Sequence, residues 1–324
     1  MKSLISKEAI KIVYMGTPEF AVAPLQKLIE QGYNISAVVT APDKKAGRGQ
    51  KVSQSAVKQF AVKQNIPVLQ PEKLKNPEFN TTLKRLAPDL IIVVAFRMLP
   101  EIVWALPPLG TFNLHASLLP QYRGAAPINW ALINGEKETG VTTFFLDKEI
   151  DTGKIILQAK VPISITDNAG TLHDKLMTAG ADLVLETVGK IRQGNLSLVS
   201  QANIDSTKLK KAPKIFKPDC KINWQQSGEQ IYNFVRGLSP YPGAWTLLSI
   251  NDKVFELKIF SGRFLIEKHQ FPAGLVITEK NEMKISVQDG FFRIEELQLQ
   301  NKKRMNTRAF LNGFGQAKVS ICFD

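Results

Sequence analysis

Short apolar runs alternate with helix-like segments over the first two hundred residues, and this alternation restricts the fold more than any other feature. The runs predict strands at Lys11–Met15, Ile35–Thr40, Leu90–Ala95, Thr111–His115, Val141–Leu146 and Lys154–Val161. Helical patterns occur near Pro18–Gln31, Ser53–Gln64, Ala126–Asn134 and Leu172–Gln193. Such alternation is typical of a Rossmann-like, doubly wound and mainly parallel α/β sheet with helices on both faces. Ligands of such sheets bind beyond the carboxyl ends of the strands.

The turn after the first predicted strand is not a dinucleotide-binding loop. It reads Met15-Gly-Thr-Pro-Glu19, which lacks the G-x-G-x-x-G spacing of a pyrophosphate cradle. Thr17 suits the N-cap of the next helix and Pro18 its first helical position. The missing glycines weaken an interpretation as a nucleotide-dependent oxidoreductase.

The last third of the chain has a different pattern. The segment 204–218 is basic, polar and interrupted by proline, as a linker would be. After a predicted helix near Ser227–Leu238, short apolar segments recur at Trp245–Ile250, Val254–Phe260, Leu275–Ile277, Ile285–Val287 and Phe291–Leu299. This pattern predicts a small C-terminal β-barrel, OB-like in kind. The expected domains are therefore residues 1–203 and 219–324, joined by a linker at 204–218.

Charge and cysteine content narrow the class of protein. The 324 residues carry a net charge of +13, which favours a polyanionic partner such as nucleic acid. The two cysteines lie far apart without metal-ligand spacing, so we expect a reducing compartment and no metal. No run is apolar enough for a membrane span or a signal peptide. We expect a cytoplasmic protein, and a monomer because no self-association motif is visible.

The segment Asn113-Leu-His115 ends the fourth predicted strand and carries the polar groups most suited to catalysis. Side chains alternate across a strand, so Asn113 and His115 should point to the same side. An amide can hold a carbonyl or oxyanion, and an imidazole can move a proton near neutral pH. Asp151, in a predicted Asp-Thr-Gly turn, could orient the imidazole and stabilise its charged form.

These motifs, with others in the same order, resemble the methionyl-tRNA formyltransferases of the folate-dependent formyltransferase superfamily. The matching motifs run through nearly the whole chain: Met15–Ala21, Ala46–Gly49, Pro88–Leu90, Asn113–Pro120, Arg123–Ile128, Asp151–Gly153, Tyr241–Ala244 and Lys302–Met305. The resemblance implies formyl transfer from 10-formyltetrahydrofolate to the amine of methionyl initiator tRNA. It also implies that Asn113, His115 and Asp151 are the catalytic residues.

The resemblance further implies where the folate co-substrate binds. The segment Ser117, Leu118, Leu119 and Pro120 matches the family's folate-contacting turn, and a stiff apolar turn with free backbone groups suits a pterin ring. Phe96, Arg97 and Met98 are expected on the other edge of that pocket. Phe96-Arg97 stands where the family often has Tyr-Gly, so the conformational freedom of a glycine is lost there.

Two basic segments are candidate tRNA contacts. The loop after the second strand carries Lys44, Lys45, Arg48 and Lys51, and the family uses an arginine at the position of Arg48 on the tRNA acceptor end. Lys302, Lys303 and Arg304, with the linker lysines 208, 210, 211 and 214, could extend the contact along the RNA backbone. The aromatic residues show no interleaving with basic residues that suggests base stacking, so core packing is expected for them.

Other functions share parts of these features. A formyltransferase for an amino sugar nucleotide would use the same three catalytic residues, but it would not need the basic loop or the basic C-terminal domain. A folate-dependent formyl hydrolase would replace the amine with water. A non-catalytic tRNA-binding module would leave the Asn, His and Asp set without a role.

Overall fold

The computed structural model describes residues 6–46, 51–201, 206–279, 281–314 and 319–322, and within them the chain forms two units. Unit 1 comprises residues 1–124, 138–162 and 173–211, and unit 2 comprises residues 125–137, 163–172 and 212–324. Each unit therefore contains segments that are distant in sequence. The boundaries expected at residues 203 and 218 stay a prediction.

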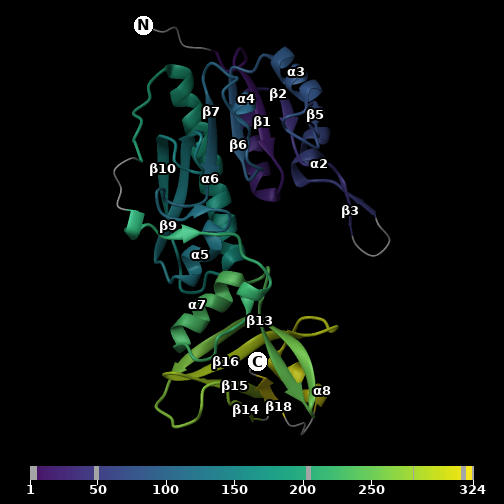
Figure 1. The fold of residues 1–324 in the computed structure, drawn as a ribbon, viewed down its shortest axis with the longest axis vertical. Helices are drawn as coiled ribbons and strands as arrows, with labels where there is room; N and C mark the ends of the chain where they lie inside the picture. The colour runs from purple at the N-terminus through teal and green to yellow at the C-terminus, as the bar shows by residue number, and fades with distance from the viewer. Residues whose placement is uncertain (1–5, 47–50, 202–205, 280, 315–318, 323–324) are drawn as a thin grey trace. The chain divides into compact units, whose positions relative to one another are not determined.

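Unit 1 is built on a seven-stranded sheet in the order β10-β9-β7-β6-β1-β2-β5 (Figure 1). Neighbours from β7 to β5 are parallel, whereas β9 is antiparallel to β7 and β10 to β9. The strands are β1 Lys11–Gly16, β2 Asn34–Val39, β5 Val68–Leu69, β6 Leu90–Val94, β7 Thr111–His115, β9 Glu138–Phe145 and β10 Ile155–Pro162. All six predicted strands are present, and the mainly parallel α/β sheet is confirmed.

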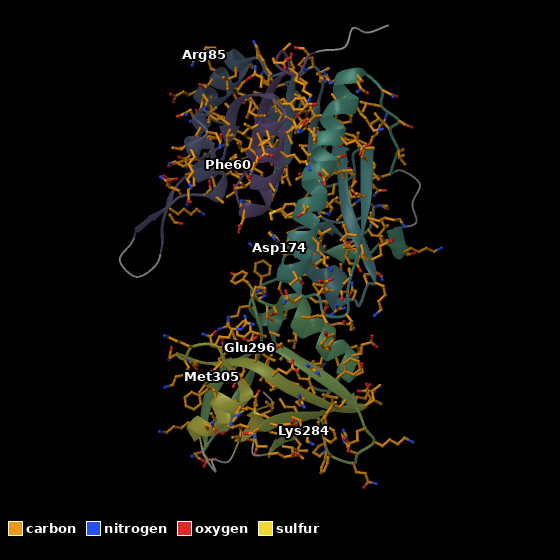
Figure 2. The ribbon with its side chains drawn as sticks, turned by 180° about the vertical axis from the view of Figure 1, so that it is seen from behind. Phe60, Arg85, Asp174, Lys284, Glu296 and Met305 are labelled. Carbon is orange, nitrogen blue, oxygen red and sulfur yellow. The ribbon has the colours of Figure 1, made fainter. Side chains whose placement is uncertain are left out.

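Helices cover both faces of this sheet. Phe79, Leu83 and Val103, from α3 and α4, join one buried cluster with Val13 and Val93 of the strands. On the other face α6 runs alongside β9, where the Thr143 and Thr187 hydroxyls are 2.8 Å apart (Figure 1). The helices of residues 19–193 are η1 Glu19–Ala21, α1 Val22–Glu30, α2 Ala56–Lys63, α3 Pro77–Leu86, α4 Glu101–Trp104, α5 Pro127–Ile133 and α6 Ala169–Gln193. Figure 2 labels Phe60 on α2, Arg85 on α3 and Asp174 on α6.

Several elements differ from the sequence-based prediction. Thr17 is not an N-cap: the chain begins a 3₁₀ turn at Glu19 with Pro18 at the cap position, and α1 starts only at Val22. Helix α3 was missed although Asn76 caps it by accepting a hydrogen bond from the Glu78 amide at 2.8 Å. The short elements α4 and β5, the hairpin of β3 Lys44–Ala46 with β4 Lys51–Ser53, and β8 Arg123–Gly124 are too brief to show periodicity.

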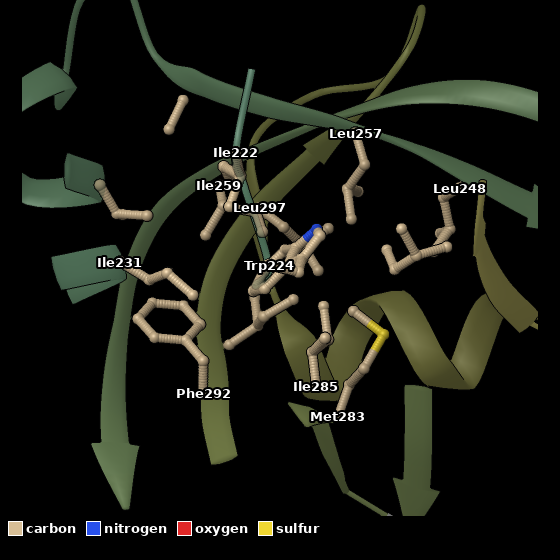
Figure 3. Close-up of a cluster of buried hydrophobic side chains, with 14 of the residues drawn as sticks. Ile222, Trp224, Ile231, Leu248, Leu257, Ile259, Met283, Ile285, Phe292 and Leu297 are labelled. Atoms are coloured by element: carbon tan, nitrogen blue, oxygen red, sulfur yellow. The ribbon is translucent and has the colours of Figure 1, made fainter. Parts of the chain in front are cut away.

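Unit 2 contains a nearly closed antiparallel sheet, as the sequence predicted. Its strand order is β14-β15-β16-β13-β12-β18, with β17 paired to β16. The strands are β12 Ala244–Ile250, β13 Lys253–Ile266, β14 Val276–Glu279, β15 Glu282–Val287, β16 Gly290–Leu299, β17 Met305–Asn306 and β18 Val319–Cys322. Trp224 and Phe292, both fully buried, lie in its core with Leu257, Met283 and Leu297 (Figure 3).

Two helices of unit 2 pack together beside this barrel. Helix α7 Gly228–Leu238 starts with a capping box in which Ser227 and Gln230 bond each other's backbone amides. The Asn129 amide of α5 donates to the Gly237 carbonyl oxygen at 2.7 Å. Arg236, 5% exposed, donates to Asn233, Ser164 and Asp167, and burial lowers the pKa of its guanidinium. The remaining elements are η2 Ser206–Lys208, β11 Lys211–Ala212, η3 Pro218–Cys220 and α8 Thr307–Phe314.

Candidate active site

Asn113 and His115 lie at the carboxyl end of β7, in the middle of the sheet of unit 1. Leu114 between them faces helix α6, because a Cβ on Gly180 would meet its side chain. Alternation along the strand then places Asn113 and His115 on the opposite face, as predicted. The Asn113 side chain is partly exposed and makes no hydrogen bond within the described residues. Its amide is therefore available to a ligand.

The imidazole of His115 is held from the loop that follows the strand. His115 is 6% exposed, and its Nε2 lies 2.8 Å from the Tyr122 carbonyl oxygen. A carbonyl only accepts hydrogen bonds, so Nε2 carries the hydrogen and Nδ1 of the neutral ring has a lone pair. Tyr122 is fixed in turn by its amide, which donates to the Lys210 carbonyl at 2.6 Å. The residue that orients the imidazole is thus Tyr122, whereas the sequence suggested Asp151 for this task.

Asp151 is brought to the same place from the loop between β9 and β10. Its Oδ2 lies 3.9 Å from His115 Nδ1 and accepts a hydrogen bond from the Gly124 amide at 3.0 Å. The residue has a φ of 57°, a left-handed conformation that is uncommon outside glycine. Two residues on, a Cβ at Gly153 would collide with the Phe145 carbonyl oxygen. The turn can therefore form only with a glycine at position 153. This turn places the Asp151 carboxylate near the His115 imidazole.

Gln201 holds this turn in place through hydrogen bonds, and no sequence pattern predicted this role. Its buried side-chain amide donates to the carbonyl oxygens of Asp151 at 3.1 Å and Gly153 at 2.7 Å. Its Oε1 accepts from an Arg123 Nη2 at 2.8 Å. Hydrogen bonds from a residue 50 positions later in the chain thus offset the cost of the left-handed backbone conformation at Asp151. No motif marks Gln201, because the contact exists only after the chain returns to the sheet edge.

The segment expected to contact folate is rigidly bonded. The Thr142 hydroxyl donates to the Ser117 carbonyl oxygen at 2.7 Å, and the Thr142 hydroxyl oxygen accepts from the Leu119 amide at 3.1 Å. Gln158 donates to the Leu119 carbonyl at 2.8 Å, and the Leu118 carbonyl accepts from the Gln121 amide. The expectation of free backbone groups is therefore wrong for these atoms, because Thr142, Gln158 and Gln121 satisfy them. Leu118 and Pro120 remain partly exposed, so their side chains are what this turn offers a ligand.

Arg97, on the other expected edge of the folate site, has defined hydrogen-bond partners. Arg97 donates to the carbonyl oxygens of Pro71 and Glu72, and its guanidinium lies 5.4 Å from the centre of the Phe96 ring. Burial lowers the pKa of this guanidinium. Positive φ occurs at Ala95 (47°) and not at Phe96 or Arg97, so the position of the lost glycine does not require one. Met98 is 72% exposed.

The basic loop predicted to contact tRNA is described only in part. Arg48 lies outside the described residues, and for Lys45 and Lys51 only the backbone of the β3–β4 hairpin is described. Lys44 is exposed. The base of the hairpin is anchored by Asp43, whose carboxylate accepts from Lys58 at 2.6 Å and from Gln70 at 2.8 Å. These hydrogen bonds, that from Lys58 first, lower the pKa of Asp43.

The second basic cluster lies in unit 2. Lys302, Lys303 and Arg304 are exposed between β16 and β17. The charge of Arg304 is already paired with Glu296 at 2.5 Å, and its guanidinium lies 4.3 Å from the centre of the Phe260 ring. Figure 2 labels Glu296 and Met305, which belong to the adjoining strands β16 and β17. The positive charge of Arg304 is therefore less available to an RNA phosphate than the sequence suggested.

Neither a metal-binding cluster nor a membrane-spanning helix is present in the part of the chain that the structure describes. Over the described residues, no group of His, Cys, Asp and Glu side chains could hold a metal ion. No helix within the same residues is long and apolar enough to cross a membrane.

Comparison with known sequences matches two family models. The model described as "Formyl transferase" matches residues 10–188, and "Formyl transferase, C-terminal domain" matches residues 214–315. The chain is 55% identical over 313 residues to the methionyl-tRNA formyltransferase of Bacteroides thetaiotaomicron, covering 96% of this chain and 97% of the relative. It is 56% identical over 317 residues to that of Parabacteroides distasonis, covering 96% and 98%.

Solved structures with a similar fold include a sugar formyl transferase and a tetrahydrofolate-bound protein. A sugar 3N-formyl transferase, solved with dTDP and 5-N-formyl-THF, aligns with a TM-score of 0.64 at 25% identity, covering 91% of this chain and 100% of that one. HypX from Aquifex aeolicus, in complex with tetrahydrofolic acid, aligns with the same TM-score at 17% identity, covering 95% of this chain and 48% of that one. The latter likeness concerns the fold alone.

Proposed function

The chain belongs to the methionyl-tRNA formyltransferase family of the formyl transferases, and from this membership we propose its reaction. It transfers a formyl group from 10-formyltetrahydrofolate to the free amine of methionyl initiator tRNA. The observation that carries the proposal is an identity of 55% to a methionyl-tRNA formyltransferase over 96% of the chain. The sugar 3N-formyl transferase, with comparable coverage, is only 25% identical.

The residues of the site fit a bound formyl donor. The donor supplies an electrophilic formyl carbon whose oxygen gains negative charge as the amine attacks. Asn113 is suited to that oxygen, because its amide has no partner among the described residues and is partly exposed. A donor placed in this way strengthens its hydrogen bond as the charge develops, which lowers the barrier.

His115 is the group that handles the proton. With its Nε2 hydrogen committed to Tyr122, the lone pair of Nδ1 accepts the proton that the attacking amine loses. The resulting imidazolium faces the Asp151 carboxylate at 3.9 Å and is stabilised by its charge. His115 then returns the proton to the folate nitrogen as that nitrogen leaves the formyl carbon. The new C–N bond replaces the old one without net change in protons.

The two substrates are assigned to different segments. Leu118 and Pro120, with Phe96, Arg97 and Met98, are proposed to border the pterin ring, because small-molecule sites are lined mainly by apolar side chains. Lys44, Lys45, Arg48 and Lys51 are proposed to hold the tRNA acceptor end, and Lys302 and Lys303 are proposed to contact tRNA phosphates. We propose that the protein acts as a monomer in the cytoplasm, where translation supplies the charged tRNA.

The decisive experiment offers two amines in parallel. Purified protein and 10-formyltetrahydrofolate are incubated with methionyl initiator tRNA or with an amino sugar nucleotide, and formylated product is quantified. We expect product from methionyl-tRNA alone, and we expect His115→Ala to abolish it. If only the amino sugar is formylated, the catalytic assignment stands and the tRNA assignment fails. If His115→Ala stays within a few-fold of wild type, the catalytic assignment fails.

A further inference from the structure

Unit 2 contains a pocket of about 390 Å³ that none of the motifs predicted. It lies among the segment 214–220, the turn 241–243 and neighbouring strands, all within one unit. Its wall combines aromatic and basic side chains, which are Phe216, Tyr241, Trp245, Lys214, Lys217 and Lys258. Pockets that bind small ligands have volumes of about 300–1,000 Å³, so this one can accept a nucleotide-sized group.

The aromatic rings of this pocket are exposed or fixed in place. Tyr241 is 82% exposed and Phe216 is 57% exposed, which is unusual for large rings on one surface. Trp245 is half-buried, and its Nε1 donates to the Lys217 carbonyl oxygen at 2.8 Å, which fixes the orientation of the indole. Exposed rings around a pocket are suited to a flat partner that stacks on them.

The cations lie against these same rings. The Lys214 ammonium is 5.1 Å from the centre of the Phe216 ring, and that of Lys217 is 5.8 Å from Trp245. Lys217 is paired with Glu256 at 2.5 Å. Lys258 donates to the Pro242 carbonyl at 3.1 Å, and neither Lys258 nor Lys214 forms an ion pair with any described residue. Two of the three lysines can therefore neutralise an anion that enters the pocket.

We propose that this pocket binds an unpaired nucleotide of the tRNA substrate, with its base in contact with both the Tyr241 and Phe216 rings and its phosphate beside Lys214 and Lys258. Stacking rings combined with lysines are the means by which proteins hold single-stranded nucleic acid, because every base has a flat face and every link a negative charge. A paired base is already stacked inside its helix and cannot enter. The inference rests on the proposed function and extends it to the kind of RNA feature that unit 2 recognises.

The test compares single-stranded with fully paired RNA on the full chain. Binding of fluorescein-labelled hexa-adenylate, of a blunt 12-base-pair RNA duplex and of AMP is measured by anisotropy or by competition. Tyr241→Ala and Phe216→Ala should each weaken hexa-adenylate binding by about tenfold, the effect of losing one stacked base. Binding of the duplex should change less than twofold. Ile266→Ala, which truncates a side chain that is 79% exposed on β13 of the same unit, is the control and should change neither.

Three results would overturn the pocket assignment. They are no binding of hexa-adenylate, equal weakening of single-stranded and duplex binding by the two variants, and AMP binding as tight as that of hexa-adenylate. The last would indicate a site for a free nucleotide. Hexa-adenylate should also quench tryptophan fluorescence in the wild type and not in Trp245→Phe, and a quench that persists in this variant contradicts stacking near Trp245.

These assays need no formyl donor, so they separate this inference from the proposed function. If the chain forms no formylmethionyl-tRNA but binds hexa-adenylate through Tyr241, the nucleotide-binding assignment of the pocket is supported and the proposed reaction is contradicted. If formylation proceeds and Tyr241→Ala leaves the KM for methionyl-tRNA unchanged, the proposed reaction is supported and the nucleotide-binding assignment of the pocket is contradicted. We expect that variant to raise this KM about tenfold while kcat at saturation is retained.

Discussion

The Nδ1 atom of His115 and the Oδ2 atom of Asp151 face one another at 3.9 Å. An N–H···O hydrogen bond spans about 2.7–3.2 Å, so this pair acts through charge and not through a shared hydrogen. The imidazole is oriented by the Tyr122 carbonyl instead, and the carboxylate is held by the Gly124 amide. The atoms that hold the two catalytic candidates belong to Tyr122 and Gly124, which lie two residues apart in one loop, so this loop sets the distance between the imidazole and the carboxylate.

Asp151→Asn removes the charge and keeps an oxygen that can accept from the Gly124 amide. We expect kcat to fall by about 10²-fold, because two unit charges about 4 Å apart attract by about 1–4 kcal/mol in settings between water and a protein surface. Single-turnover formylation measures this step directly. Asp147→Asn, which changes an exposed carboxylate in the same loop, serves as the control and should leave kcat unchanged.

Asn113→Ala should lower kcat by about 10²–10³-fold, as loss of an oxyanion donor does. The substitution should leave the melting temperature nearly unchanged, because the Asn113 side chain makes no hydrogen bond to the described residues. Steady-state kinetics and a thermal melt measure the two effects. A variant that melts early while its remaining folded fraction keeps full activity would identify Asn113 as a structural residue.

Gln201→Met should reduce both stability and turnover. The substitution leaves the carbonyl oxygens of Asp151 and Gly153 without their donor, which costs about 1–3 kcal/mol for buried groups. Because the left-handed turn then relaxes, we expect kcat to fall about tenfold while the KM for folate is retained. Urea unfolding and kinetics test the two parts. Gln158→Met, which removes a donor from the folate segment, should raise the folate KM instead.

Asp43 makes stability depend on acid pH. Hydrogen bonds from Lys58 and Gln70 lower its folded-state pKa below the usual value of 3.8, so the ionised carboxylate stabilises the fold. The contribution is complete above the unfolded-state pKa and is lost as pH falls through the lower folded-state value. Asp43→Asn should therefore flatten the decline of melting temperature below about pH 4. The exposed Asp252→Asn is the control, and identical pH profiles for Asp43→Asn and wild type would contradict the assignment.

Binding of tRNA should weaken steeply with salt. If Lys44, Lys302 and Lys303 contact phosphates, raising salt from about 50 to 200 mM should lower the affinity at least tenfold. Binding releases counterions from the tRNA, and the entropy gained by this release is smaller when the salt concentration is high. Replacing these three lysines with glutamine should reduce the slope of log affinity against log salt. Arg304→Gln should reduce it less, because Arg304 is paired with Glu296. An affinity that barely changes with salt would rule out a phosphate contact.

The elements visible in the sequence are those whose own residues specify them. The strands from Lys11 to Val161 contain enough apolar residues to be recognised locally, and β7 begins and ends where the pattern predicted. Asn113 and His115 share a face because alternation is a property of any strand. Elements of two to four residues, such as β5 and α4, contain too little periodicity to be predicted.

The mainly parallel sheet, the following barrel, the Asn-x-His pair and the family could all be read from the amino-acid sequence, because each depends on residues that are near one another in the chain or on whole motifs. The folded structure was needed to show that Tyr122 orients His115, that Gln201 supports Asp151, and that Arg97 is held by the Pro71 and Glu72 carbonyls. The structure was also needed to show that Phe216, Tyr241 and Trp245 border one basic pocket. These relationships join atoms from distant parts of the chain, and such contacts form only when packing brings the segments together.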